Sequence, residues 1–340
     1  MKRHFLTLVL LTLPCAADPS RAVRECAQCH PAQARPHPAT SMAHAMELPR
    51  ECAILRDHPL LTFEDAGYTY RIERRGDESI YTVTNGHDTM AVRLGWAFGL
   101  GRAGQTYVFE KDGKLFESRV SFYSELNGLD LTMGAANAKP ANLLQAAGRV
   151  LEAEDARCFG CHSTGGVTGR KLTLDRLTPG VQCERCHGSA EDHLKGLKTG
   201  DSRLAQMKDL RTMSAEDTAN FCGQCHRTWS DIASSGAMGV VNVRFQPYRL
   251  TTSKCYDSDD RRIRCTACHD PHREIDTVNA NYDVKCQACH GGGKSTALCC
   301  KIAVRECASC HMPKLEMPGA HHKFTDHDIR IVRANAPYPN

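Results

Sequence analysis

Seven copies of a Cys-x-x-Cys-His pattern are the residues in this sequence whose types and spacing could do chemistry. Two thiols three positions apart lie on one face of a helical turn, so both can bond to one edge of a porphyrin while the adjacent imidazole is aimed at the iron. The pattern therefore predicts covalent attachment of c-type haem (haem c), about seven per chain. The predicted attachment cysteines are Cys26, Cys29, Cys158, Cys161, Cys183, Cys186, Cys222, Cys225, Cys265, Cys268, Cys286, Cys289, Cys307 and Cys310. The imidazoles predicted to bind iron beside them are His30, His162, His187, His226, His269, His290 and His311.

Zinc sites and disulfides are the other common uses of paired cysteines, and both explain this pattern less well. Zinc knuckles do not need a histidine directly after the second cysteine. A disulfide framework, which is usual in cysteine-rich secreted chains, leaves the seven repeated histidines without a role. Four cysteines lie outside the motifs and the leader: Cys52, Cys255, Cys299 and Cys300. They permit two disulfides, with Cys255 joined to Cys299 or Cys300 as the preferred pairing, and a thiolate haem ligand or a reactive thiol is the alternative.

The ligand opposite each motif histidine decides whether an iron only carries electrons or can also bind a substrate. Pro271 stiffens the chain after one motif and turns His272 toward a neighbouring haem, and His193 follows another motif in a similar way. The tail from residue 321 to 327 holds three imidazoles with no motif of its own to serve. We expect iron to be bound by His44, His193, His272, His321 and His327. The roles of His37, His58, His87 and His322 stay open.

The motifs are spread unevenly, with one near the N-terminus and six between residues 158 and 311. So few residues per haem cannot enclose each macrocycle in a protein core, so we expect the haems to contact one another and form the core. We divide the chain into a signal peptide (1–17), an N-terminal haem segment (18–59), a β-rich insert (60–140) and a six-haem cytochrome domain (141–340). Helices are expected at 141–157 and at 214–226, where Ser214 can cap.

Alternating apolar and aromatic residues indicate strands at 68–72, 80–83, 106–109 and 119–123, with a hairpin turn at 111–114. The expected fold class is α+β, mostly α and irregular: a haem-cored multihaem protein of short helices and loops with a small antiparallel β-subdomain. The Gly-x-Gly-x-x-Gly match at 99–104 lacks the flanking strand, helix and acidic residue of a dinucleotide site, so we interpret it as a turn.

The first 17 residues have a basic start, an apolar run at 5–13 and small residues before Asp18, which is typical of a cleaved signal peptide. A lipoprotein with Cys15 as the lipid-bearing residue is the alternative. No other apolar stretch approaches the ~20 residues of a spanning helix. We therefore expect a periplasmic or extracellular protein without a membrane span. Haem propionates would offset the formal net charge of +4, so we do not expect nucleic-acid binding.

The order of the motifs and of the histidines that follow them resembles a known group of multihaem cytochromes. The resemblance is carried by residues 183–188 with His193, by 265–272, by 307–314 and by 324–327. The group includes the tetrahaem electron carriers of ammonia oxidisers, relatives of hydroxylamine oxidoreductase, and multihaem cytochromes with tetratricopeptide repeats. The resemblance implies that His272 and His327, together with His321, are distal ligands. Two departures are the short tail, which has no room for such repeats, and the Cys299–Cys300 pair.

The expected function is electron transfer through about seven haems, mostly with two histidine ligands, between an extracytoplasmic donor and acceptor. Redox proteins are the expected partners, and self-association through stacked haems is a further possibility. The alternative is a multihaem oxidoreductase that acts on small nitrogen or sulfur oxo-compounds at one open haem. That alternative needs an iron without a second protein ligand and a nearby acid–base cluster, and no motif in the sequence marks one.

Overall fold

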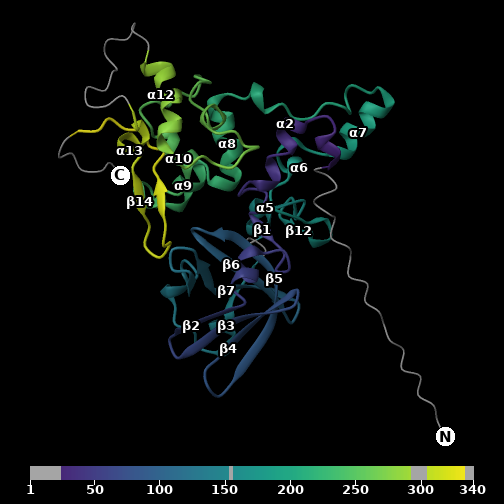
Figure 1. The fold of residues 1–340 in the computed structure, drawn as a ribbon, viewed down its shortest axis with the longest axis vertical. Coiled ribbons are helices and arrows are strands. Elements are labelled where there is room, and N and C mark those ends of the chain that lie inside the picture. Colours follow the sequence, from purple (N-terminus) through teal and green to yellow (C-terminus); the bar gives the residue numbers. More distant parts are fainter. Residues whose placement is uncertain (1–23, 153–155, 292–304, 334–340) are drawn as a thin grey trace.

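The computed structural model describes residues 24–152, 156–291 and 305–333. The predicted signal peptide, Cys15, Cys299 and Cys300 lie outside these residues. The described chain forms an antiparallel sheet and a series of short helices that lie along one side of it (Figure 1). The N-terminal motif segment lies with the helices, and the chain then enters the sheet before it returns to them.

The sheet is built from nine strands, seven of which follow one another in the order β2-β3-β4-β5-β6-β7-β8. Each neighbouring pair is antiparallel, as expected for strands joined by tight turns. In β4 every second side chain is buried, because alternate residues of a strand point to opposite faces. The seven strands are β2 (Leu60–Asp65), β3 (Tyr68–Arg75), β4 (Glu78–Thr84), β5 (Thr89–Gly101), β6 (Gly104–Lys111), β7 (Lys114–Tyr123) and β8 (Gly128–Leu131).

The sheet curls until it is nearly closed. Its first and last strands, β2 and β8, contact each other, and Arg119 on β7 donates a hydrogen bond to Asp65 on β2 at 3.4 Å. Two short strands extend the sheet: β1 (Met46–Glu47) pairs with β5, and β9 (Gly148–Val150) pairs with β7. Inside, the Phe109 ring stacks on Phe116 with the ring centres 5.3 Å apart. The sheet therefore has an apolar core of its own.

The expected fold class, mostly helical and irregular with a small β-subdomain, was wrong. Helices account for 34% of the structure and strands for 26%, and the large antiparallel sheet is a major part of the fold. The strands at 68–72, 80–83, 106–109 and 119–123 are present, and the expected turns lie at 102–103 and 112–113, between β5 and β6 and between β6 and β7. The sequence analysis named no strand at β2, β5 or β8. It also missed β1 and β9, because two or three residues are too few to show a period.

The prediction of one helix over residues 141–157 was also wrong. The chain forms α4 (Leu143–Ala147), then β9, then α5 (Ala156–His162). Gly148 ends α4 in an extended conformation and pairs with Ser118 of β7, so strand pairing replaces the helix that residues 141–157 favour locally. In contrast, the helix expected at 214–226 is confirmed as α8 (Ala215–His226), and Ser214 caps it by accepting a 3.0 Å hydrogen bond from the Asp217 backbone N–H.

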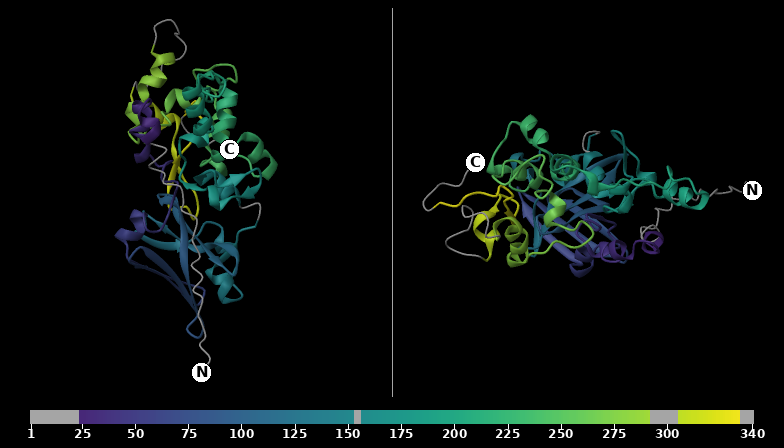
Figure 2. Two further views of the ribbon diagram at one scale, coloured as in Figure 1. Left: turned by 90° about the vertical axis from the view of Figure 1, so that its right-hand side faces the viewer. Right: turned by 90° about the horizontal axis from the view of Figure 1, so that it is seen from above.

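The other helices are short, and several consist of little more than one attachment motif. They are seen from two further sides in Figure 2. Within the described residues, no helix is both long enough and apolar enough to cross a membrane. Besides those already named, the α-helices are α2 (Pro31–Ala34), α3 (Ala53–Asp57), α6 (Cys183–His187), α7 (Ala190–Thr199), α9 (Trp229–Ser235), α10 (Gln246–Thr251), α11 (Cys265–Cys268), α12 (Asp283–His290) and α13 (Cys307–His311).

Gly148→Ala tests the close pairing of β9 with β7. A β-carbon at position 148 would overlap the backbone carbonyl oxygen of Glu117, so we expect a loss of about 1–3 kcal/mol in unfolding free energy. Urea unfolding followed by circular dichroism measures the loss, and hydrogen exchange should show weaker amide protection at 148–150. Gly128→Ala on β8 is the matched control, because its nearest new contact is ordinary at 3.6 Å. Equal effects of the two substitutions would contradict this account.

Candidate haem attachment sites

All seven motifs lie at or next to the C-terminal end of a short helical segment. The first follows a helical turn at 24–27, and the others lie in α5, α6, α8, α11, α12 and α13. The backbone N–H of His30 donates to the Cys26 carbonyl at 2.8 Å, and that of His269 donates to the Cys265 carbonyl at 2.9 Å. These bonds close one turn, so the two thiols of a motif share a face and the imidazole follows directly after them.

Several imidazoles are oriented by a hydrogen bond from Nδ1 to a carbonyl oxygen. Among the motif histidines, Nδ1 of His162 lies 2.7 Å from the Ala45 oxygen, and Nδ1 of His311 lies 2.7 Å from the Arg330 oxygen. A carbonyl only accepts, so Nδ1 carries the proton and Nε2 keeps its lone pair. This arrangement is typical of histidines that bind a metal through Nε2.

Three histidines outside the motifs are oriented in the same way. Nδ1 of His193 lies 2.5 Å from the Ala205 carbonyl oxygen, and Nδ1 of His327 lies 3.0 Å from that of Thr325. Nδ1 of His272 instead faces a carboxylate oxygen of Asp270 at 3.0 Å. In all three the Nδ1 side is engaged by an acceptor, which leaves Nε2 as the nitrogen available to a metal.

Each of these three imidazoles faces the imidazole of a motif. The ring centres are 6.5 Å apart for His30 and His193. They are 6.2 Å apart for His187 and His272, and 6.2 Å apart for His269 and His327. Two imidazoles on one metal ion have ring centres ~6.2 Å apart, because each metal–nitrogen bond is ~2.0 Å and each ring centre lies ~1.1 Å behind its nitrogen. The three pairs therefore have the spacing that one iron between two histidines requires.

Burial keeps the imidazoles in the form that binds a metal. Burial lowers the pKa of His327 to about 4, and it also lowers the pKa of His162, His226 and His269. Desolvation disfavours the charged imidazolium, so these rings are neutral near neutral pH. Only the neutral imidazole has a lone pair to donate to iron.

His44 and His321, which the sequence analysis also assigned to iron, have different surroundings. Both ring nitrogens of His44 are engaged, Nδ1 with a Glu47 carboxylate oxygen at 2.8 Å and Nε2 with the Pro38 carbonyl oxygen at 2.8 Å. Nε2 of His321 lies 2.8 Å from a carboxylate oxygen of Asp130, and its ring packs edge-on against Tyr123. In this arrangement neither histidine offers Nε2 to an iron.

His37 is an imidazole whose role the sequence left open. It is 6% exposed, and its Nδ1 is buried without a hydrogen-bond partner among the described residues. Burial is the main reason that its pKa is lowered, and the His272 ring nearby lowers it further. Only its place a few residues after the first motif could have indicated it, because its burial depends on contacts with distant parts of the chain.

A buried ion pair fixes the backbone on both sides of His327. Arg249 on α10 is 1% exposed and donates two hydrogen bonds to the carboxylate of Asp326, at 2.8 and 2.9 Å. It also donates to the Asp328 carboxylate at 3.3 Å. The carboxylates on either side of His327 thus share one guanidinium, and this bidentate geometry holds the loop in place. No local pattern indicates this pairing, because the partners are about 77 residues apart.

The region that holds six motifs has little apolar core of its own. Both clusters of buried apolar side chains belong to the sheet and to residues up to Leu177. Around the fifth and sixth motifs, Ile275, Val278 and Val284 are between 51% and 64% exposed. A flat apolar macrocycle would cover these exposed apolar side chains, which lie beside paired thiols and imidazoles that can bind a metal. The residues present therefore fit haem.

The described residues also bear on the other uses of cysteine. No group of three or more His, Cys, Asp or Glu side chains in the described ranges is gathered as in a metal-ion site. Neither Cys52 nor Cys255 is joined by a disulfide to another cysteine of the described ranges. Cys52 is fully buried, and its thiol donates to the side-chain oxygen of Gln105 at 3.2 Å. The preferred pairing of Cys255 with Cys299 or Cys300 falls on residues outside the described ranges.

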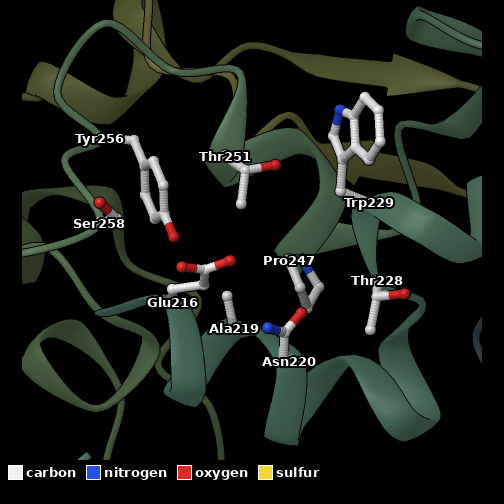
Figure 3. A pocket seen from close by; sticks show the side chains of 9 residues that line it. All are labelled: Glu216, Ala219, Asn220, Thr228, Trp229, Pro247, Thr251, Tyr256 and Ser258. Atoms are coloured by element: carbon white, nitrogen blue, oxygen red, sulfur yellow. The ribbon is translucent and has the colours of Figure 1, made fainter. Parts of the chain in front are cut away.

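A cavity of about 230 Å³ lies beside α8 (Figure 3). The carboxylate of Glu216 and the hydroxyl of Tyr256 face each other across it, and Trp229 stands at its far side. None of its nine lining residues is a cysteine or a histidine.

A family model described as "Cytochrome c554 and c-prime" matches residues 131–188, which include the second and third motifs. The chain is also similar to "Multiheme cytochrome MtrA" of Shewanella baltica (strain OS185), with 26% identity over 194 residues. That match covers 52% of this chain and 49% of the relative, so the chain spans about half the length of the curated relative that it matches. No solved structure matches the chain significantly.

These matches support a multihaem c-type cytochrome. Covalently bound haem c is the cofactor that they imply. The resemblance to the carriers of ammonia oxidisers in particular stays a prediction, because the family match covers only a small part of the chain.

Arg249→Met tests the ion pair around His327. It leaves the carboxylates of Asp326 and Asp328 buried without their cation, and we expect a loss of about 3–5 kcal/mol in unfolding free energy. Urea unfolding of the haem-loaded protein, followed by far-ultraviolet circular dichroism, measures the loss. Arg262→Met is the control, because the Arg262 side chain is 75% exposed in its pair with Asp260 and should leave stability unchanged. A stable Arg249→Met variant would show that the pair does not hold this loop.

Proposed function

We propose that this protein transfers electrons through about seven covalently attached haems, most of them held between two histidines. The observation that carries the proposal is the set of three imidazole pairs with ring centres 6.2 to 6.5 Å apart. An iron closed on both sides by imidazole has no position for a substrate and changes oxidation state with little rearrangement. That coordination favours electron transfer over catalysis at the metal.

We assign both axial ligands at three of the sites. His30 and His193 would hold the iron of the first motif, His187 and His272 that of the third, and His269 and His327 that of the fifth. The seven motif histidines would be proximal ligands, and the 14 motif cysteines would be the covalent anchors. When bound, haem supplies the reversible one-electron change of its iron. The chain supplies the ligands, their orientation through Nδ1, and the exclusion of water.

The partners would be redox proteins that donate and accept electrons outside the cytoplasm. The signal peptide predicted at 1–17 and the match to a multihaem cytochrome support export to the periplasm or beyond. The relative is named only as a multihaem cytochrome, so the donor and acceptor of this chain are left to experiment.

The spin state of the ferric, fully haem-loaded protein tests the proposal. We expect electron paramagnetic resonance to show low-spin signals that account for all the haem, because histidine on both sides of iron gives a strong ligand field. A high-spin component of about one haem per chain in the wild-type protein would instead favour the oxidoreductase with one open haem.

His327→Ala tests the ligand assignment itself. Loss of this imidazole should open one iron and convert about one haem per chain to the high-spin state, and added imidazole should restore the low-spin signal. His87→Ala is the matched control, because His87 lies exposed in a turn of the sheet and should change no signal. If both variants keep the wild-type spectrum, His327 is not an axial ligand.

A further inference from the structure

We propose that the odd-numbered attachment sites form a relay, in which each one supplies the imidazole that closes the preceding odd-numbered site. Sites are numbered by motif along the chain, from the first (26–30) to the seventh (307–311). The inference rests on the proposed function and adds a spatial order to it. In this order the first site neighbours the third rather than the second.

The three imidazole pairs follow one rule. His193 comes just after the third motif and faces His30 of the first. His272 comes just after the fifth motif and faces His187 of the third. The third pair obeys the same rule, since His327 comes after the seventh motif and faces His269 of the fifth. Each step therefore skips one motif in the sequence.

The short segments between each odd motif and its second histidine keep consecutive odd sites close together. His269 and His272 are three residues apart, and a chain reaches at most ~3.6 Å per residue, so their α-carbons lie within ~11 Å. His193 lies six positions after His187, and part of that segment is wound into α7. Each short segment would thus carry two histidines, one for each of two irons.

The segment after the seventh motif is longer, but it folds back on itself. β14 (Lys314–Glu316) and β15 (Lys323–Thr325) form an antiparallel hairpin. The Asp326 N–H then donates to the Pro313 carbonyl at 2.9 Å, and the Arg330 N–H donates to the His311 carbonyl at 3.3 Å. The hairpin therefore returns His327 to the seventh motif, where the ion pair with Arg249 holds its loop.

A contact between two motifs supports the first step of this order independently of the imidazole pairs. The thiols of Cys26 and Cys183 are in hydrogen-bond contact, which joins the first site to the third. The second site adjoins two others: the Arg185 side chain of the third motif donates to the Gly160 carbonyl at 3.0 Å, and the Cys161 thiol lies 3.4 Å from the Gln224 carbonyl oxygen of the fourth motif. On its other side, the Phe159 ring of α5 packs edge-on against Phe98 of the sheet at 5.1 Å.

The even sites lie beside the relay. The thiols of Cys222 and Cys265 are in hydrogen-bond contact, so the fourth site adjoins the fifth. The backbone N–H groups of Glu306 and Cys307 donate to the Asp283 carboxylate at 2.8 and 2.9 Å, which ties α13 of the seventh site to α12 of the sixth. The second site thus lies beside the relay, in contact with both the third site and the fourth.

Removal of single sites distinguishes this order from an array in sequence order. Cys183→Ala/Cys186→Ala removes covalent attachment at the third site, and Cys158→Ala/Cys161→Ala removes it at the second. Neighbouring ferric irons broaden each other's paramagnetic resonance signals. We expect loss of the third site to leave the first magnetically isolated, with a sharp low-spin signal of about one haem per chain. Loss of the second site should leave no isolated haem.

The inference is overturned if the isolated signal appears on loss of the second site, or if it is absent on loss of the third. A high-spin wild-type protein would count against the proposed function instead, so the two failures are distinguishable. If the wild-type protein is entirely low-spin but the variants give the wrong isolation pattern, the relay is overturned and the proposed function stands.

A second pair of variants keeps every haem attached. His272→Met should raise the reduction potential of the third site, because methionine opposite histidine favours the reduced iron. When a sample is poised so that one haem per chain is reduced and diamagnetic, the signal of the first site should sharpen. His327→Met is the control, since it acts at the fifth site and leaves the first beside a ferric third. Identical spectra for the two poised variants would overturn the order.

Discussion

In the proposed coordination, the separation of two imidazole rings across one iron is the constraint on which the motif region depends. Two metal–nitrogen bonds fix that separation at ~6.2 Å, so the backbone segments that carry paired histidines must be held to a fraction of an ångström. The chain meets this requirement with short helices that end at the motif, with carbonyl groups that bind Nδ1, and with Arg249 beside His327. Each device orients a ring, and none of them is itself a ligand.

The two parts of the fold are stabilised by different means. The sheet buries aromatic side chains in a protein core, whereas the motif region leaves apolar side chains bare and would bury them against haem. Phe159 links the parts, since it lies between the two cysteines of the second motif and packs against Trp96 and Phe98 of the sheet. The sheet thus gives one attachment site a rigid support that the haems do not have to provide.

Spacing rules made the motifs, the α8 cap and the tight turns predictable, because each depends on residues within a few positions of one another. The extent of the sheet was not predictable, since β9 forms where helix-favouring residues meet a distant strand. For the ligands, the stiff Asp-Pro-His element indicated His272, whereas the surroundings of His44 and His321 depend on Pro38, Glu47 and Asp130. Partners such as Arg249 and Asp326 carry no local signature, and only the folded chain identifies them.

The second ligand of each odd site comes from a later part of the chain, and this would affect the order in which the sites are completed during synthesis. A chain that is synthesised and exported from its N-terminus presents the first motif long before His193, and the fifth motif before His327. The attachment thiols of an odd site are therefore available before its second axial ligand has emerged. Under the proposed assignment, covalent attachment and axial closure would be separate events in biogenesis, and the last odd pair would be completed only when the hairpin of β14 and β15 folds. His327 would then complete a site whose attachment cysteines lie some 60 residues earlier in the chain.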